Sequence, residues 1–97
     1  MEETICEAIR NKTEIAISIS GAGKTFEFQP YVLWRDASGA KLAGYKITSI
    51  GIYPPNTVWE ALAVSDIGDV VNLSRRLFPK PLPGSFSKPS RDLIICD

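Results

Sequence analysis

A glycine-rich segment near the N-terminus is the closest approach to a known chemical motif. Residues 18–25 read Ser-Ile-Ser-Gly-Ala-Gly-Lys-Thr, which matches the phosphate-binding loop G-x-x-x-x-G-K-[ST] except that Ser18 replaces the first glycine. Such a loop binds phosphate because its amides begin a helix. After Thr25 the chain alternates as Phe-Glu-Phe-Gln and reaches Pro30. The pattern therefore predicts a hairpin turn and not a nucleotide site.

Side chains suited to catalysis or metal binding are scarce. The chain has no histidine, so neither a Ser-His nor a Cys-His pair is available. Its two cysteines, Cys6 and Cys96, are too far apart in sequence to form a zinc motif. Asp66 and Asp69 flank a glycine, and aspartates in turns are usually solvated or cap backbone amides. We therefore expect a protein that is not an enzyme and that holds no cofactor and no metal.

Tyrosine and tryptophan are the better candidates for function, because each combines an apolar ring with a polar tip that suits a binding surface. Packing in the core of a small domain is the alternative, and we favour it for the two tryptophans. An arginine that follows one of these tryptophans could bind an anion or stack on a ring, although a solvated hairpin charge is the simpler interpretation. The candidate ligand-binding residues are Tyr31, Arg35, Tyr45 and Trp59, chosen from a set of aromatics that also includes Trp34 and Tyr53.

Charge is balanced overall but unevenly distributed. Residues 1–74 hold six Lys/Arg and nine Asp/Glu, a net charge of −3, whereas residues 75–97 hold five and two, a net charge of +3. Nucleic-acid binders normally carry a basic face on their folded part, so nucleic acid is not the expected main partner. Weak binding through the basic tail, which contains Arg75, Arg76 and Lys80, stays open as an alternative.

The ends of the chain bear on its location. The sequence begins Met-Glu-Glu, which is acidic where a signal peptide is basic, and no apolar run approaches the roughly 20 residues that cross a bilayer. We expect a cytoplasmic protein without a membrane segment, in which both cysteines are reduced and buried. Because the termini of small domains often lie close together, a Cys6–Cys96 bridge is the alternative.

Periodicity predicts one helix followed by short strands. In residues 2–11, Ile5, Ala8 and Ile9 fall on one helical face, and residues 13–20 alternate as a half-buried strand. A hairpin is predicted over residues 26–47, with its turn at Asp36–Gly39 and a bend at Pro30. Further strands are expected at Val58–Val64 and Asp69–Leu73, and the apolar end Leu93–Cys96 could add another.

The C-terminal tail is too rich in proline for a helix or a central strand. Four of the seven prolines stand at positions 79, 81, 83 and 89, and their spacing gives no P-x-x-P motif of the kind that SH3 domains bind. We expect the tail to pack along the surface through apolar anchors. These anchors are Leu77, Phe78, Leu82 and Phe86.

These elements indicate a single, mainly β (α+β) domain. An N-terminal helix followed by five short strands at about 8–12-residue spacing points to a small β-barrel or a strongly bent sheet, and closing the sheet would also remove exposed edges. We assign residues 1–73 to this barrel and residues 74–97 to the proline-rich basic tail with a possible terminal strand.

Within the hairpin the sequence resembles the WYL domain, an SH3-like (Sm-like) β-barrel found mostly in bacterial regulators. The resemblance therefore implies that the five predicted strands form an SH3-like or Sm-like barrel. Residues 30–33, Pro-Tyr-Val-Leu, are similar to the first segment of that family, and residues 42–45, Leu-Ala-Gly-Tyr, to the end of the second. Residues 62–67 loosely resemble the third, so the resemblance spans about residues 3–72. Ala40 and Lys41 stand where the family has its name-giving Trp and Tyr.

The resemblance implies a stand-alone, non-enzymatic module that binds a ligand or a protein. Its partner would be an unknown small anionic ligand or another protein. One alternative is a structural or oligomerising module, in which the tail or the strand at 93–96 docks on another copy and forms a homo-oligomer. The other alternative is the weak nucleic-acid binder described above.

Overall fold

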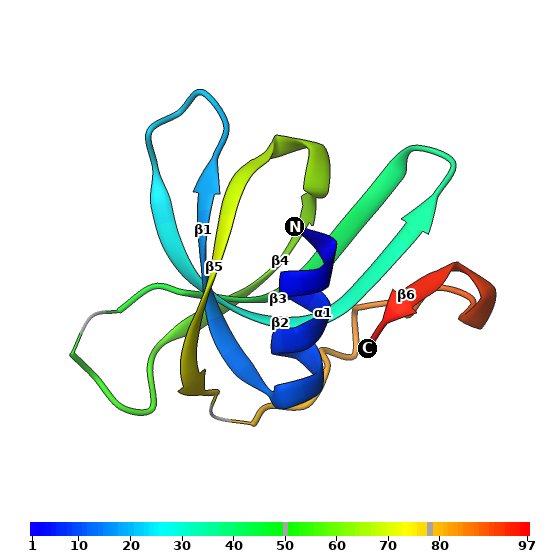
Figure 1. Cartoon of the computed structure of the whole chain (residues 1–97). Helices are drawn as coiled ribbons and strands as arrows, with labels where there is room; N and C mark the ends of the chain where they lie inside the picture. The colour runs from blue at the N-terminus through cyan, green and yellow to red at the C-terminus, as the bar shows by residue number, and fades with distance from the viewer. Residues whose placement is uncertain (50, 78) are drawn as a thin grey trace.

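One helix and six strands make up the computed structural model, which describes residues 1–49, 51–77 and 79–97. Two short 3-10 helices precede the last two strands (Figure 1). The mainly β prediction is confirmed. The elements are α1 (Glu2–Asn11), β1 (Thr13–Ile19), β2 (Thr25–Asp36), β3 (Gly39–Ile47), β4 (Thr57–Ala63), η1 (Val64–Asp66), β5 (Ile67–Arg76), η2 (Arg91–Leu93) and β6 (Ile94–Cys96).

The strands form one antiparallel sheet in the order β4-β3-β2-β1-β5, and β6 pairs with β2 outside this path. In the described part of the chain, β4 and β5 lie at opposite ends and do not pair with each other. The sheet is therefore not closed into a barrel, contrary to the prediction of a closed five-stranded one. Its apolar face is buried by α1, so closure is not required to remove that face from water.

Helix α1 covers one face of the sheet, which we call the inner face (Figure 1). The helix begins and ends as predicted, although the left-handed residue that ends it is Lys12, at φ 55°, and not Asn11. The residues of α1 and the inner face form a single apolar core. Its buried members are Ile5, Cys6, Ala8, Ile9, Ile15, Ile17, Phe28, Leu33, Leu42 and Ile67.

Strand β2 continues through Pro30, where the sequence predicted a bend. Pairing with β1 ends at Phe28, and pairing with β6 begins at Leu33, so the missing N–H of Pro30 falls between the two partners. A bulge between Pro30 and Val32 inserts Tyr31 as an extra residue opposite β3. The bulge shifts the alternation of side chains, which is why Phe28 and Leu33 both reach the core although they are five residues apart.

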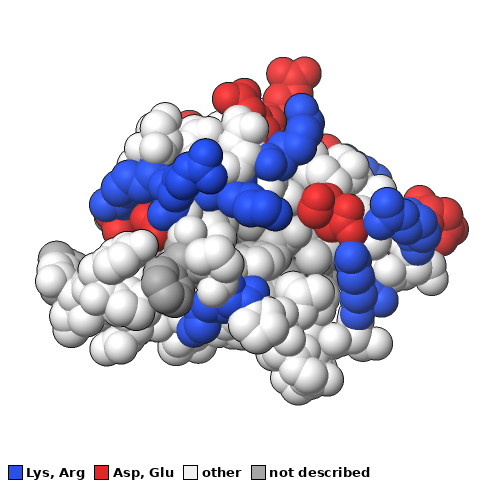
Figure 2. All heavy atoms as spheres, turned by 90° about the horizontal axis from the view of Figure 1, so that it is seen from below, with Lys and Arg blue, Asp and Glu red and all other residues white. Residues whose placement is uncertain are grey.

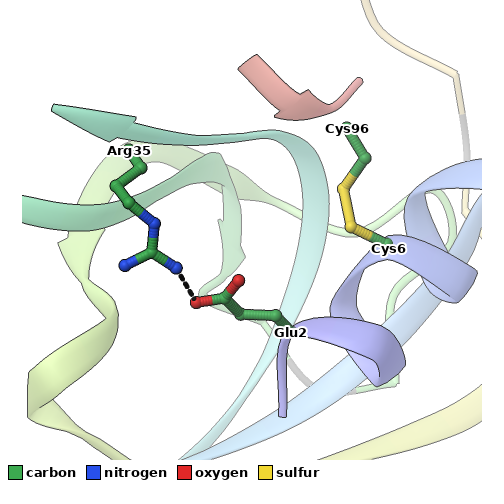
Figure 3. The surroundings of a disulfide bond; sticks show 4 residues. All are labelled: Glu2, Cys6, Arg35 and Cys96. Carbon is green, nitrogen blue, oxygen red and sulfur yellow. Dashed lines mark hydrogen bonds and ion pairs between the residues drawn. A yellow bond between two sulfur atoms is a disulfide. The ribbon is translucent and has the colours of Figure 1, made fainter. Parts of the chain in front are cut away.

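A disulfide joins Cys6 of α1 to Cys96 of β6 (Figure 3). The expectation of two reduced thiols is therefore wrong. The two cysteines can form a bridge because α1 packs on β2 and β6 pairs with β2. This topology brings their Cα atoms to 5.8 Å from each other. Disulfides are typical of oxidising compartments, so the prediction of a cytoplasmic location loses the support of reduced cysteines. Separately, no described helix is long and apolar enough to cross a membrane.

The glycine-rich segment forms a hairpin turn, as predicted. Ile19 N–H donates to the carbonyl of Lys24 at 3.0 Å, and the chain enters the antiparallel β1–β2 pair on both sides. Gly21 and Gly23 have φ values of 74° and 63°, which favour glycine in the turn. No helix follows, so the arrangement that binds phosphate in nucleotide sites is absent from these described residues.

The turn between β2 and β3 holds an unusually acidic carboxyl group. Asp36 Oδ1 accepts hydrogen bonds from the Ser38 hydroxyl at 2.6 Å and from the Ser38 N–H at 2.8 Å. These bonds lower the pKa of Asp36 from 3.8 to about 2. The turn predicted at Asp36–Gly39 is confirmed, because β2 ends at Asp36 and β3 begins at Gly39. The lowered pKa of Asp36 provides a way to test its hydrogen bonds.

Ser38→Ala is expected to raise the pKa of Asp36 back toward 3.8, because the hydroxyl bond is the largest cause of the shift. Since the folded-state pKa lies below the unfolded value, the stabilisation is fully present above about pH 4 and is lost as the pH falls through 2. Carboxyl ¹³C NMR titration measures the midpoint. Ser87→Ala, an exposed serine outside this turn, serves as the control. An unchanged midpoint in Ser38→Ala would contradict the assignment.

Candidate functional site

Five aromatic side chains gather on the face of the sheet opposite α1, which we call the outer face. Tyr45 lies between Tyr31 and Trp59, with ring centres 5.5 and 4.9 Å away, and Tyr31 and Trp59 are 6.1 Å apart. The ring of Phe86 in the tail lies 5.0 Å from that of Trp59 in β4 and 6.0 Å from that of Trp34 in β2. We call the four aromatic residues of the sheet, Tyr31, Trp34, Tyr45 and Trp59, the aromatic cluster, and Phe86 of the tail packs on it.

The register of β2, β3 and β4 places the cluster. Tyr45 is paired with Gln29 on one side and with Trp59 on the other, so their side chains share a face. Tyr31 joins them because of the bulge. The two tryptophans, which we expected in the core, are half-buried and lie outside the core formed with α1.

Arg35 lies apart from the other three predicted site residues. Its guanidinium bonds Glu2 of α1 at 2.6 Å, on the helix side of the sheet (Figure 3). Strict alternation would place Tyr31 and Arg35 on one face, and the bulge after Pro30 separates them. The structure therefore brings together Tyr31, Tyr45 and Trp59, and places Arg35 elsewhere.

The tail crosses the aromatic cluster and is bonded to it. Lys80 N–H donates to the Tyr31 hydroxyl at 3.1 Å, and the Tyr45 hydroxyl donates to the carbonyl of Pro81 at 2.6 Å. The Lys80 ammonium donates to Thr57 Oγ1 at 2.6 Å and lies 4.6 Å from the centre of the Tyr45 ring. Burial raises the pKa of Tyr31, partly opposed by its bond with Lys80.

The tail anchors are only partly those predicted. Leu77 is buried and Phe86 is half-buried against the aromatic cluster, whereas Leu82 is exposed. Phe78 lies outside the described residues. At its C-terminal end the tail is held by β6, which confirms the predicted terminal strand.

A groove of about 900 Å³ is bounded by β1, β2, the end of β5 and the β3–β4 loop. Its apolar wall includes Phe26, Ile52, Tyr53 and Pro55, and Tyr53 is 78% exposed. The polar wall is made by two carboxylates, two arginines and three hydroxyl groups. The polar residues are Glu14, Thr25, Glu27, Thr48, Ser49, Arg75 and Arg76.

Charges in the groove are arranged around Arg75. Its guanidinium bonds Glu27 at 2.7 Å and Glu14 at 3.4 Å, and the bond to Glu27 raises the pKa of Arg75. Arg76 makes no ion pair with the residues that the structure describes. Lys and Arg side chains gather on the part of the surface that Figure 2 presents, with acidic side chains beside them.

A buried amide continues the polar wall. Gln29 is fully buried and donates from Nε2 to Glu14 at 3.3 Å. Its Oε1 accepts no hydrogen bond from the described residues, which is uncommon for a buried polar atom. Gln29 also lines a cavity of about 110 Å³ with Thr57 and Lys80, so it connects the groove to the tail contacts.

Sequence reasoning did not select the groove. The sequence signals for the groove are the Arg75-Arg76 pair and Tyr53. The sequence does not show that they lie together, because the β3–β4 loop and the end of β5 meet only in the folded chain. Among the described residues no group of three or more His, Cys, Asp or Glu could hold a metal ion. No family model, curated protein or solved structure matches the chain.

Proposed function

We propose that this chain is a non-enzymatic binding module for a small anionic ligand, held in the groove between the sheet and the β3–β4 loop. The observation that carries the proposal is the groove itself. Its volume of about 900 Å³ falls in the range of small-molecule sites, which are largely apolar with a few fixed polar groups. Arg76 supplies a cation without an ion pair in the described structure, and guanidinium groups bind carboxylates and phosphates in two-point geometry.

A relation to WYL regulatory domains is part of this proposal. It is supported by the order of a helix and successive antiparallel strands, with the strand order β5-β1-β2-β3-β4. In this proposal the chain is an open version of the SH3-like arrangement. In it, α1 and the tail cover the two faces of the sheet.

The alternatives have less support. The oligomerising hypothesis assumed a tail that docks on another copy, whereas here the tail bonds its own sheet. Nucleic-acid binding depended on the basic tail, including Arg75, Arg76 and Lys80. Arg75 pairs with Glu27 and Glu14, and Lys80 bonds Thr57. Lys88 and Arg91 both pair with Asp97, so four of the five cations from residue 75 onward already have partners. Size-exclusion chromatography with light scattering and a salt titration of nucleic-acid binding test the two, respectively.

Arg76→Gln is expected to weaken anion binding about tenfold or more, because a hydrogen bond to a charged group contributes about 1.5–3 kcal/mol. A thermal-shift screen with phosphate, citrate and AMP identifies a probe that stabilises the wild type, and calorimetry then measures its affinity for each variant. Arg10→Gln is the matched control, since Arg10 is an exposed arginine of α1 outside the groove.

The same set of variants defines failure. If none of the three anions raises the melting temperature of the wild type, the anionic ligand class is wrong. If a probe binds and Arg76→Gln lowers its affinity no more than Arg10→Gln does, the groove is not its site.

A further inference from the structure

The tail segment Pro79–Pro83 has the conformational properties of a bound proline-rich peptide. Each proline fixes its own φ near −65° and confines the residue before it to extended conformations. With prolines at 79, 81 and 83, the φ angles of these three residues are fixed, and Lys80 and Leu82 are confined to extended conformations. Such a segment loses little entropy on docking, which is why aromatic grooves recognise proline-rich peptides.

The contacts of this segment are those of recognition and not those of a core. Tyr31 and Tyr45 bond backbone groups of Lys80 and Pro81, which any extended peptide presents. Phe86 packs against two indole rings of the cluster. Pro81 is exposed to solvent, and none of residues 79–86 belongs to the buried core.

Specificity is provided by two side chains of the tail. The Lys80 ammonium lies against the Tyr45 ring and donates a hydrogen bond to Thr57. A cation–π contact and a hydrogen bond therefore recognise this side chain. Phe86 stands six residues later, after a turn in which its N–H bonds the carbonyl of Pro83 at 3.0 Å. The segment thus offers a lysine between two prolines and a downstream aromatic ring.

Both ends of the segment are held independently of the cluster. Leu77 N–H bonds the carbonyl of Lys12 at 3.0 Å, and Cys96 is bonded to Cys6. These anchors keep the segment at a high effective concentration over the cluster. Breaking the disulfide removes one covalent anchor of the tail, and residues 79–86 are not members of the core that α1 and the inner face form.

We propose that the aromatic cluster is a recognition surface for a proline-rich segment of a partner protein, which the chain's own tail fills while the Cys6–Cys96 disulfide is intact. The partner segment has the chemistry of the tail, with a basic residue between two prolines followed by an aromatic residue. The surface is distinct from the groove, so this proposal stands or falls independently of the anionic ligand.

The test uses a synthetic peptide of residues 79–90 and the full chain. In the release variant, Cys6→Ser/Cys96→Ser/Phe86→Ala, the tail loses its covalent anchor and its aromatic contact. We expect this variant to bind the peptide at least about tenfold more tightly than the oxidised wild type, because the tail competes less effectively. Tryptophan fluorescence reports binding, since both tryptophans belong to the cluster.

Added substitutions place the peptide on the cluster. Tyr45→Phe in the release variant should weaken binding about fivefold, the effect of one neutral hydrogen bond. Ser65→Ala, which removes an exposed hydroxyl from η1, should leave binding unchanged. A peptide with alanine in place of Lys80 and Phe86 should bind at least about tenfold more weakly.

If the release variant fails to fold, Phe86→Ala with the disulfide intact replaces it, and we expect tighter peptide binding than for the wild type. Equal binding by the wild type and the folded variant would overturn the proposal, as would equal binding with Tyr45→Phe. Concentration-dependent dimers without peptide binding would also overturn it, in favour of tail exchange between copies.

Discussion

Reduction of the Cys6–Cys96 disulfide is expected to lower the free energy of unfolding by about 2–4 kcal/mol. The bond joins residues 90 positions apart, so it closes almost the entire chain into one loop and restricts the unfolded state. Cys6 lies in the core and Cys96 packs against it, so the reduced thiols also lose well-packed contacts if β6 moves away. For a domain of this size the melting temperature should fall by on the order of 10–30 °C.

Thermal unfolding followed by circular dichroism, with and without a phosphine reductant, measures the effect. Cys6→Ser/Cys96→Ser should unfold near the temperature of the reduced wild type and should not respond to reductant. A wild type that melts at the same temperature in both conditions would contradict the prediction. So would two titratable thiols in protein purified without reductant.

Local patterns in the sequence predicted most of the fold. The helix at residues 2–11, the strand after it and the 26–47 hairpin all depend on periodicity and turn residues within a few positions. The apolar run that ends at Cys96 indicates a possible last strand, and the structure forms it over Ile94–Cys96. These elements form as predicted because local propensity and burial favour the same conformation.

Features that depend on distant parts of the chain were missed. An apolar run does not reveal that β6 pairs with β2, and without that pairing the Cys6–Cys96 bridge is only the alternative to two reduced thiols. Closure of the sheet was expected because edges are usually hidden, yet burial of the inner face by α1 does not require it. Pro30 predicts a bend because proline cannot donate to a neighbouring strand. The sequence does not show that β2 pairs with β1 before Pro30 and with β6 after it, so that the missing N–H needs no partner.

The candidate site was partly predictable for a similar reason. Tyr45 and Trp59 meet through the register of consecutive antiparallel strands, which a correct hairpin assignment comes close to specifying. Tyr31 joins them only through the bulge, and the same bulge separates Arg35 from them. A one-residue insertion in a strand changes which face every later side chain occupies, and nothing in the sequence marks it except the neighbouring proline.

Gly44→Ala is expected to destabilise the fold by about 3 kcal/mol or more, at the upper end of overpacking effects. Gly44 is buried in β3, opposite Pro30 of β2. A Cβ added there would lie 2.1 Å from the carbonyl oxygen of Gln29 and 2.6 Å from Phe28 Cε2. Both neighbours are fully buried, and one of the atoms is backbone, so neither can move away cheaply.

Gly84→Ala is the matched control, since a Cβ at Gly84 meets nothing within 4 Å and its φ is not positive. Urea unfolding of both variants should show a large loss of stability, or failure to fold, for Gly44→Ala alone. If the two variants were equally stable, β2 and β3 could not approach as closely as the structure shows. Gly44 also belongs to the Leu-Ala-Gly-Tyr segment that carries the WYL resemblance, so close packing on Phe28, and not ligand contact, accounts for the glycine.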